Sequence, residues 1–123
     1  MNILECSSVG DKRFSALYAR IKAFNNKTIE SLYQNAKRSE DGHIPGKGKY
    51  VHHFVWKGKT FPASKLTSLY IYLWSEYFKE NPDLLEYASK FDGFTDKFKG
   101  KAINSQADAI ALLVKKYRKE RIL

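Results

Sequence analysis

The sequence has 123 residues, and its 22 lysines and arginines against 13 aspartates and glutamates give a formal net charge of +9 at pH 7. A chain of this length fits one domain, residues 1–123, and with 43% hydrophobic and 15% aromatic residues it is too apolar for a disordered polycation. No membrane span or signal peptide is recognised, and one cysteine excludes an internal disulfide. We therefore expect a cytoplasmic protein without a membrane partner, and the charge favours phosphate-bearing partners.

Two helices are predicted early in the chain. The first, over residues 13–24, begins after Asp11 as its cap, although the same residues also allow a strand. The second begins after the N-cap Thr28 and ends near Arg38. Their apolar stripes consist of Phe14, Leu17, Tyr18, Ile21 and Phe24 in the first helix, and Ile29, Leu32, Tyr33 and Ala36 in the second.

A loop and a β-hairpin are predicted next. Residues 39–49 are dense in turn formers, which indicates a loop. Residues 50–56 are aromatic and β-branched and predict a strand. Lys57 and Gly58 then form a plausible tight turn into a short second strand over residues 60–61.

The clearest helical pattern follows the hairpin. Ser64 is expected to cap a long helix, which Asn81 ends. Asn81 is also expected to cap the next, shorter helix, and Pro82 suits its first position. The apolar stripe of the long helix, with members three and four residues apart, consists of Leu66, Leu69, Tyr70, Leu73, Trp74, Tyr77 and Phe78.

The end of the chain predicts one more helix. Residues 91–100 are expected to form an aromatic loop or a short helical turn. The last helix opens at Asn104 or Ser105, where Asp108 completes a capping box. Its apolar stripe consists of Ala107, Ile110, Ala111, Val114 and Tyr117. Together these elements predict an α+β fold, a mostly helical single domain with a small β-hairpin.

No metal-binding pattern is recognised. The soft ligands are Cys6, His43, His52 and His53, without Cys-x-x-Cys or His-Glu-x-x-His spacing. The adjacent His52 and His53 are expected to point to opposite faces of a strand. We expect neither a metal nor a cofactor.

The basic residues gather in two stretches, one in and before the aromatic hairpin and one in the C-terminal tail. Bases stack on aromatic rings while lysines neutralise phosphates, so each stretch is a candidate nucleic-acid surface. Alternatively, the aromatic face belongs to the core and the tail complements a helix dipole. The candidate nucleic-acid-binding residues are Lys47, Lys49, His52, Lys57, Lys59, Lys115, Lys116, Arg118 and Lys119.

A polar strip on the second predicted helix is a third constellation. Glu30, Gln34 and Lys37 are four and three residues apart and share one helix face. A carboxylate beside an amide and a cation can polarise water or stabilise a developing positive charge. The alternative is a solvated face with a favourable ion pair.

Several strings resemble small proteins encoded by phages and prophages, to which no activity is assigned. They include Gly10-Asp-Lys-Arg-Phe14-Ser15-Ala and Phe91-Asp-Gly-Phe94-x-Asp96. This resemblance implies a location in the cytoplasm of an infected or lysogenic bacterium.

The sequence also resembles the NADAR superfamily of mostly helical N-glycosidases, which act on ADP-ribose-linked or riboflavin-pathway substrates. The shared elements occur in the same order: Phe14-Ser15, Glu30-x-x-Tyr33-Gln34-x-x-Lys37 and Asn81-Pro82-x-Leu84. The family's C-terminal Asp-x-x-Trp-Gly element has no clear counterpart, and Asp108 is a loose substitute for its aspartate.

The resemblance implies cleavage of a C1′–N bond through an oxocarbenium-like centre. Glu30 would be catalytic, stabilising that cation or activating water as carboxylates do in glycoside hydrolysis. Tyr33 or Trp74 would stack on a base, with core packing the alternative for Trp74. The ligand-binding residues that the resemblance implies are Arg13, Phe14, Ser15, Tyr33, Gln34, Lys37, Asn81, Asn104 and Asp108.

Three functions therefore remain open. The first is an N-glycosidase-type hydrolase acting on a nucleotide or on nucleic-acid-linked ADP-ribose. The second is a non-catalytic protein that binds DNA or RNA. The third is a phage effector that binds and inhibits a host or defence protein, its positive charge matched to an acidic target.

Overall fold

The computed structural model describes residues 2–46, 48–97 and 106–122, and within them four α-helices and three small sheets surround one hydrophobic core. The helices are α1 (Ile29–Ala36), α2 (Leu66–Glu80), α3 (Pro82–Ala88) and α4 (Gln106–Ile122). The strands are β1 (Ile3–Glu5), β2 (Arg20–Ile21), β3 (Lys27–Thr28), β4 (Lys37–Arg38), β5 (His53–Trp56), β6 (Lys59–Pro62) and β7 (Gly93–Thr95). The predicted α+β class is confirmed, with more strands than the expected hairpin.

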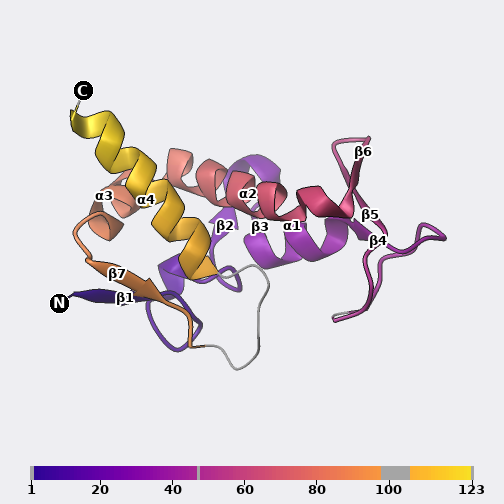
Figure 1. Cartoon of the computed structure of the whole chain (residues 1–123), viewed down its shortest axis with the longest axis horizontal. Helices are drawn as coiled ribbons and strands as arrows, with labels where there is room; N and C mark the ends of the chain where they lie inside the picture. Colours follow the sequence, from indigo (N-terminus) through magenta and orange to yellow (C-terminus); the bar gives the residue numbers. More distant parts are fainter. Residues whose placement is uncertain (1, 47, 98–105, 123) are drawn as a thin grey trace.

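Helix α2 runs along the long axis of the molecule, with the hairpin at one end and both chain termini at the other (Figure 1). It contacts α1, α3 and α4. Its predicted stripe is confirmed from Leu69 to Phe78, where all six members are buried. The predicted Ser64 cap is wrong, because Ser64 lies in a 3₁₀ turn and Lys65 precedes the helix without a side-chain cap.

The predicted helix over residues 13–24 is wrong. Asp11 does act as a cap, but only for a 3₁₀ turn over Lys12–Phe14. The strand alternative holds only for β2, which pairs antiparallel with β3. Leu17 and Tyr18 are 44% and 48% exposed, so the apolar residues of this segment do not share one buried face.

Helix α1 begins where the sequence predicts. The Thr28 side chain accepts the backbone N–H of Ser31 at 3.1 Å, as an N-cap does. The helix ends at Ala36, earlier than expected, because Lys37 and Arg38 continue as strand β4. Strand β4 pairs antiparallel with β5, so the end of α1 is joined directly to the hairpin.

The hairpin β5–β6 forms around the predicted turn. Lys57 and Gly58 both have positive φ, 50° and 78°, which is the pattern of a type I′ turn. Phe54 pairs with Phe61 across the two strands, and their rings stack 5.1 Å apart. The first strand is shorter than predicted, because regular pairing begins at His53.

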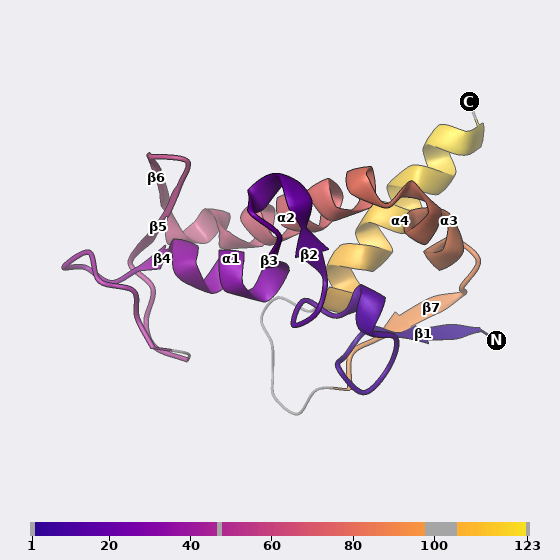
Figure 2. The ribbon, with the colours of Figure 1, turned by 180° about the vertical axis from the view of Figure 1, so that it is seen from behind.

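Strands β1 and β7 pair in parallel beside α4, near the N-terminus (Figure 2). Strand β7 falls in residues 91–100, where a loop or helical turn was expected, so that prediction is wrong for residues 93–95. Residues 91–92 and 96–97 lie outside regular structure, as expected of a loop, and residues 98–100 lie outside the described residues. Glu5 ties the two strands together, accepting hydrogen bonds from the Thr95 hydroxyl at 2.9 Å and from the backbone N–H groups of Ser7 and Lys97, both at 3.0 Å.

The last two helices follow the predicted order. Pro82 opens α3, as predicted, but the Asn81 side chain donates to the Tyr77 carbonyl at 2.9 Å and so terminates α2 instead of capping α3. Helix α4 buries Ile110 and Val114 of its predicted stripe. The predicted caps Asn104 and Ser105 lie outside the described residues. Among the described helices, none is both long and apolar enough to cross a membrane.

Candidate active site

The polar strip of α1 lies where the N-terminal segment contacts the helix. The Gln34 side-chain amide donates to the Glu30 carboxylate at 3.0 Å, and both side chains are half-buried. The Glu30 backbone N–H donates to the Ala16 carbonyl at 3.0 Å. Because Glu30 also stands in the first turn of α1, the helix dipole favours its negative charge. The predicted carboxylate–amide pair is therefore formed.

Aromatic rings border the strip. Tyr33 of α1 and Tyr70 of α2 are both 6% exposed, and their ring centroids are 5.0 Å apart. The Lys37 ammonium lies 4.6 Å above the Tyr33 ring, a cation–π contact. Glu30, Tyr33 and Gln34 thus lie together on α1, as predicted. Lys37 was expected on the same helix but belongs to strand β4, from which its ammonium reaches the Tyr33 ring. Tyr70 is a neighbour that the sequence analysis placed only in the core.

Two carboxylates, Glu30 and Asp96, act on the Tyr70 phenol through their negative charge. Burial raises the pKa of Tyr70, and the negative charges of Glu30 and Asp96 raise it further, so this hydroxyl stays protonated and can donate a hydrogen bond. Asp96 follows strand β7 and is half-buried. Sequence spacing gave no signal for Asp96, because the parallel β1–β7 pairing places it.

Two further polar side chains belong to this region: Gln106 of α4 and Ser15 of the N-terminal segment itself. The backbone N–H of Ala16 donates to the Gln106 side-chain oxygen of α4 at 2.7 Å. The Ser15 side chain is fully buried, and its Oγ has no hydrogen-bond partner among the described residues. Gln106 was not among the predicted site residues, since only the fold brings α4 to residue 16.

Arg13 and Phe14 are engaged elsewhere. The Arg13 guanidinium forms two hydrogen bonds with the Asp11 carboxylate, at 3.0 and 2.7 Å, and lies 4.9 Å from the Tyr87 ring centroid. Phe14 is fully buried, with Tyr87 and Phe78 as ring neighbours. Phosphate binding by Arg13 would therefore compete with Asp11, and Phe14 presents no surface to a ligand in this conformation.

The remaining predicted ligand residues are not gathered at the strip. Asn81 lies about 16 Å along the axis of α2 from Tyr70, given a rise of about 1.5 Å per residue. Asp108 is exposed in the first turn of α4. Asn104 lies outside the described residues.

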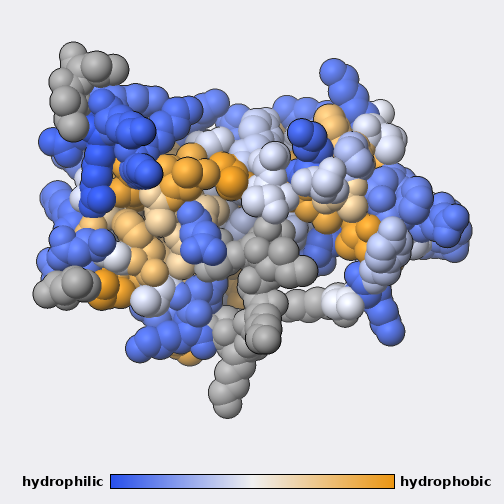
Figure 3. Space-filling view, viewed as in Figure 1, coloured by the Kyte–Doolittle hydropathy of each residue, from blue (hydrophilic) through white to orange (hydrophobic). Residues whose placement is uncertain are grey.

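The two basic stretches lie at opposite ends of the molecule, and Figure 3 shows hydrophilic residues over both ends. Lys49, His52, Lys57 and Lys59 are exposed at or beside the hairpin, and Lys47 lies outside the described residues. Lys115, Lys116, Arg118 and Lys119 are exposed on α4. Arg118 also donates to the Ser89 and Phe91 carbonyls, each at 2.6 Å. These stretches cannot form one continuous binding surface.

The described residues contain no group of three or more side chains that could hold a metal ion. The expectation that His52 and His53 face opposite ways is wrong: their Nδ1 atoms lie 2.9 Å apart, because His52 precedes the regular part of β5. Cys6 is fully buried, and burial, with the charges of Asp96, Glu5 and Asp11, raises the pKa of its thiol to about 12. Such a thiol is not a nucleophile at neutral pH.

Comparison with known proteins adds one match. A family model described as DarT1-associated NADAR antitoxin matches residues 39–123. This range includes the hairpin and α2, α3 and α4, and it begins just after the strip on α1. No curated protein sequence matches the chain.

Proposed function

Because the chain belongs to the DarT1-associated NADAR antitoxin family, whose model covers more than half of it, we propose that the protein is an N-glycosidase-type hydrolase. The family match also confirms the NADAR resemblance of the sequence. Its substrate is an ADP-ribose-type group linked to a nucleotide or nucleic acid. The observation that carries the proposal is the half-buried Glu30–Gln34 pair beside the protonated phenol of Tyr70.

The proposed reaction breaks a C1′–N bond. As this bond lengthens, positive charge develops at C1′, and the Glu30 carboxylate stabilises it or takes a proton from the attacking water. The water oxygen forms the new bond to C1′, and the departing nitrogen keeps the bonding electrons and gains a proton. Gln34 holds the Glu30 carboxylate in place, while Lys37 contacts a phosphate. The Tyr33 ring is only 6% exposed and packs against Lys37 and Tyr70, so we assign it no stacking on a base.

The variant E30Q tests this mechanism. It keeps the shape of the side chain and an acceptor oxygen for Gln34 but removes the charge. We expect turnover to fall by about two to four orders of magnitude, the usual contribution of a catalytic acid or base. The rate at which ADP-ribose is released from an ADP-ribosylated oligonucleotide is measured by chromatography.

The matched control is E86Q, since Glu86 is an exposed glutamate of α3. It loses the same charge and should keep full turnover. Both variants should keep the melting temperature of the unmodified protein. Turnover by folded E30Q at the rate of E86Q would refute the role of Glu30.

A second candidate function rests on the description of the family. The matching model is named for an antitoxin associated with DarT1, which favours a toxin as a protein partner. A net charge of +9 would speed association with an acidic surface on such a partner. Under this candidate the protein neutralises the toxin by binding it, without chemistry.

Co-expression with the toxin separates the two candidates. If protection is enzymatic, cells that produce the toxin survive with the unmodified protein or E86Q and die with E30Q. Survival with E30Q, together with co-purification of the toxin, would instead establish neutralisation by binding.

A further inference from the structure

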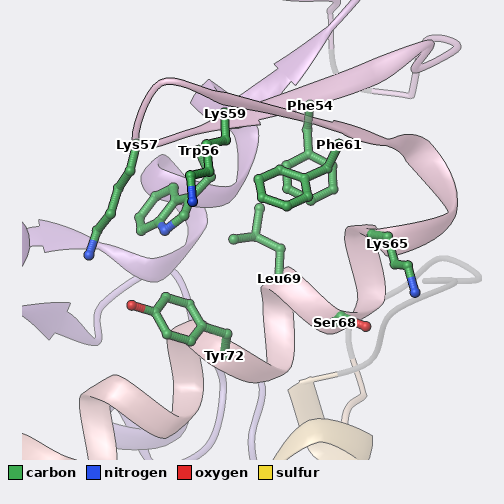
Figure 4. Close-up of a pocket in the computed structure, with 9 residues that line it drawn as sticks. All are labelled: Phe54, Trp56, Lys57, Lys59, Phe61, Lys65, Ser68, Leu69 and Tyr72. Carbon is green, nitrogen blue, oxygen red and sulfur yellow. The ribbon is translucent and has the colours of Figure 1, made fainter.

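A hollow lies between the β5–β6 hairpin and α2 and includes no residue of the polar strip (Figure 4). Its volume is about 540 Å³, enough for a planar ring system with its substituents. Aromatic side chains form a large part of its wall. The rings that line it belong to Phe54, Trp56, Phe61 and Tyr72.

The aromatic walls are held in place by packing. Phe54 and Phe61 stack with an interplanar angle of 17°. Trp56 meets the Phe24 and Tyr72 rings edge-on, at 5.2 and 6.1 Å between centroids. Trp56, Phe61 and Tyr72 remain half-buried, so parts of their surfaces are open to a ligand. A flat aromatic guest would enter a hollow that is already formed.

Positive charge surrounds this hollow. Lys57, Lys59 and Lys65 line it, and all three are exposed. In Figure 4, Lys57 and Lys59 lie beside Trp56, whereas Lys65 lies beyond the Phe54–Phe61 pair. No carboxylate is among the described residues that line it. The hollow therefore suits an aromatic group flanked by negative charge on both sides.

We infer that this pocket binds an unpaired base of single-stranded nucleic acid, with the neighbouring phosphates on the three lysines. Every base has a flat face that stacks on aromatic rings, so binding would tolerate different sequences. A duplex keeps its bases stacked and paired, out of reach of such a pocket. The inference does not depend on Glu30, because pocket and strip share no residue.

The first test measures binding of a labelled, unstructured single-stranded oligonucleotide to the full chain by fluorescence anisotropy. One variant carries K57Q, K59Q and K65Q; its matched control carries K115Q, K116Q and K119Q, the same loss of charge at the other end of the molecule. We expect the slope of log affinity against log salt to fall by about 2 in the pocket variant only. Equal losses in both variants would overturn the inference.

The second test concerns the base. Ser68 lines the pocket and is exposed, so S68W should fill the hollow without removing any packing. We expect S68W to weaken binding roughly ten-fold or more, the size of a lost stacking contact. An abasic strand should bind the unmodified protein with a similar loss. Equal affinity for the abasic and normal strands, or tighter binding of duplex, would overturn the inference.

A third readout needs no variant. Trp56 lines the pocket, whereas Trp74, the other of the two tryptophans, is fully buried. Stacking of a base should quench Trp56 fluorescence, and the abasic strand should not. The variant E30Q should bind as the unmodified protein does, so failure of the pocket and failure of the proposed hydrolysis give different results.

Discussion

The carboxylate of Glu5 makes the stability of this fold depend on pH. Burial alone would raise its pKa, but hydrogen bonds from Ser7, Lys97 and Thr95 lower it from 4.5 to about 2. A lowered pKa means that the folded state favours the charged form. The stabilisation is therefore complete above pH 4.5 and is lost as the pH falls toward 2.

The variant E5Q should make this dependence visible in urea unfolding at a series of pH values. At pH 7 we expect it to reduce the free energy of unfolding by about 1–2 kcal/mol, because partial exposure screens the carboxylate and reduces the effect of the shift. The difference from the unmodified protein should vanish near pH 2. The control is E40Q, which changes an exposed glutamate of the loop. A difference that persists unchanged at pH 2 would contradict the prediction.

Among the elements, the β5–β6 hairpin turns through a backbone conformation that favours glycine. Gly58 has φ of 78°, and a Cβ built there meets nothing within 4 Å, so conformation alone opposes a side chain. We expect G58A to lower the free energy of unfolding by about 1–2 kcal/mol. The variant G58N should cost less, since asparagine adopts this conformation more readily. Equal stability of G58A and the unmodified protein in urea would contradict the turn assignment.

Local signals predicted the elements that local interactions determine. The Thr28 cap, the Glu30–Gln34 pair and the Lys57-Gly58 turn each depend on residues at most four positions apart, and each forms in the structure. Residues 13–24 show the limit of such signals. Their apolar residues have helical spacing, yet contacts with α1 and α2 fix the backbone instead, as the donation from Glu30 to the Ala16 carbonyl illustrates.

At the scale of the whole molecule, the site and the charge depend on tertiary arrangement. Tyr70, Asp96 and Gln106 join the surroundings of the strip from three separate parts of the chain, so spacing in the sequence could not reveal them. The residues of the two basic stretches were predicted from the sequence. Their location at opposite ends of the molecule follows from the direction of α2 and α4. The pocket combines the predicted aromatic strand with Ser68, Leu69 and Tyr72 of α2, of which only Leu69 was in the predicted apolar stripe.

The parallel pairing of Ile3 with Gly93 has a consequence for the order of folding during synthesis. The first strand leaves the ribosome while its partner is still untranslated, so Leu4, buried in the finished protein, has no native cover until β7 follows. Because such distant contacts close late, native structure can start at the hairpin and α2, whose contacts are local. Strand β1 is therefore among the last parts of the chain to become inaccessible to proteases and to chaperone binding.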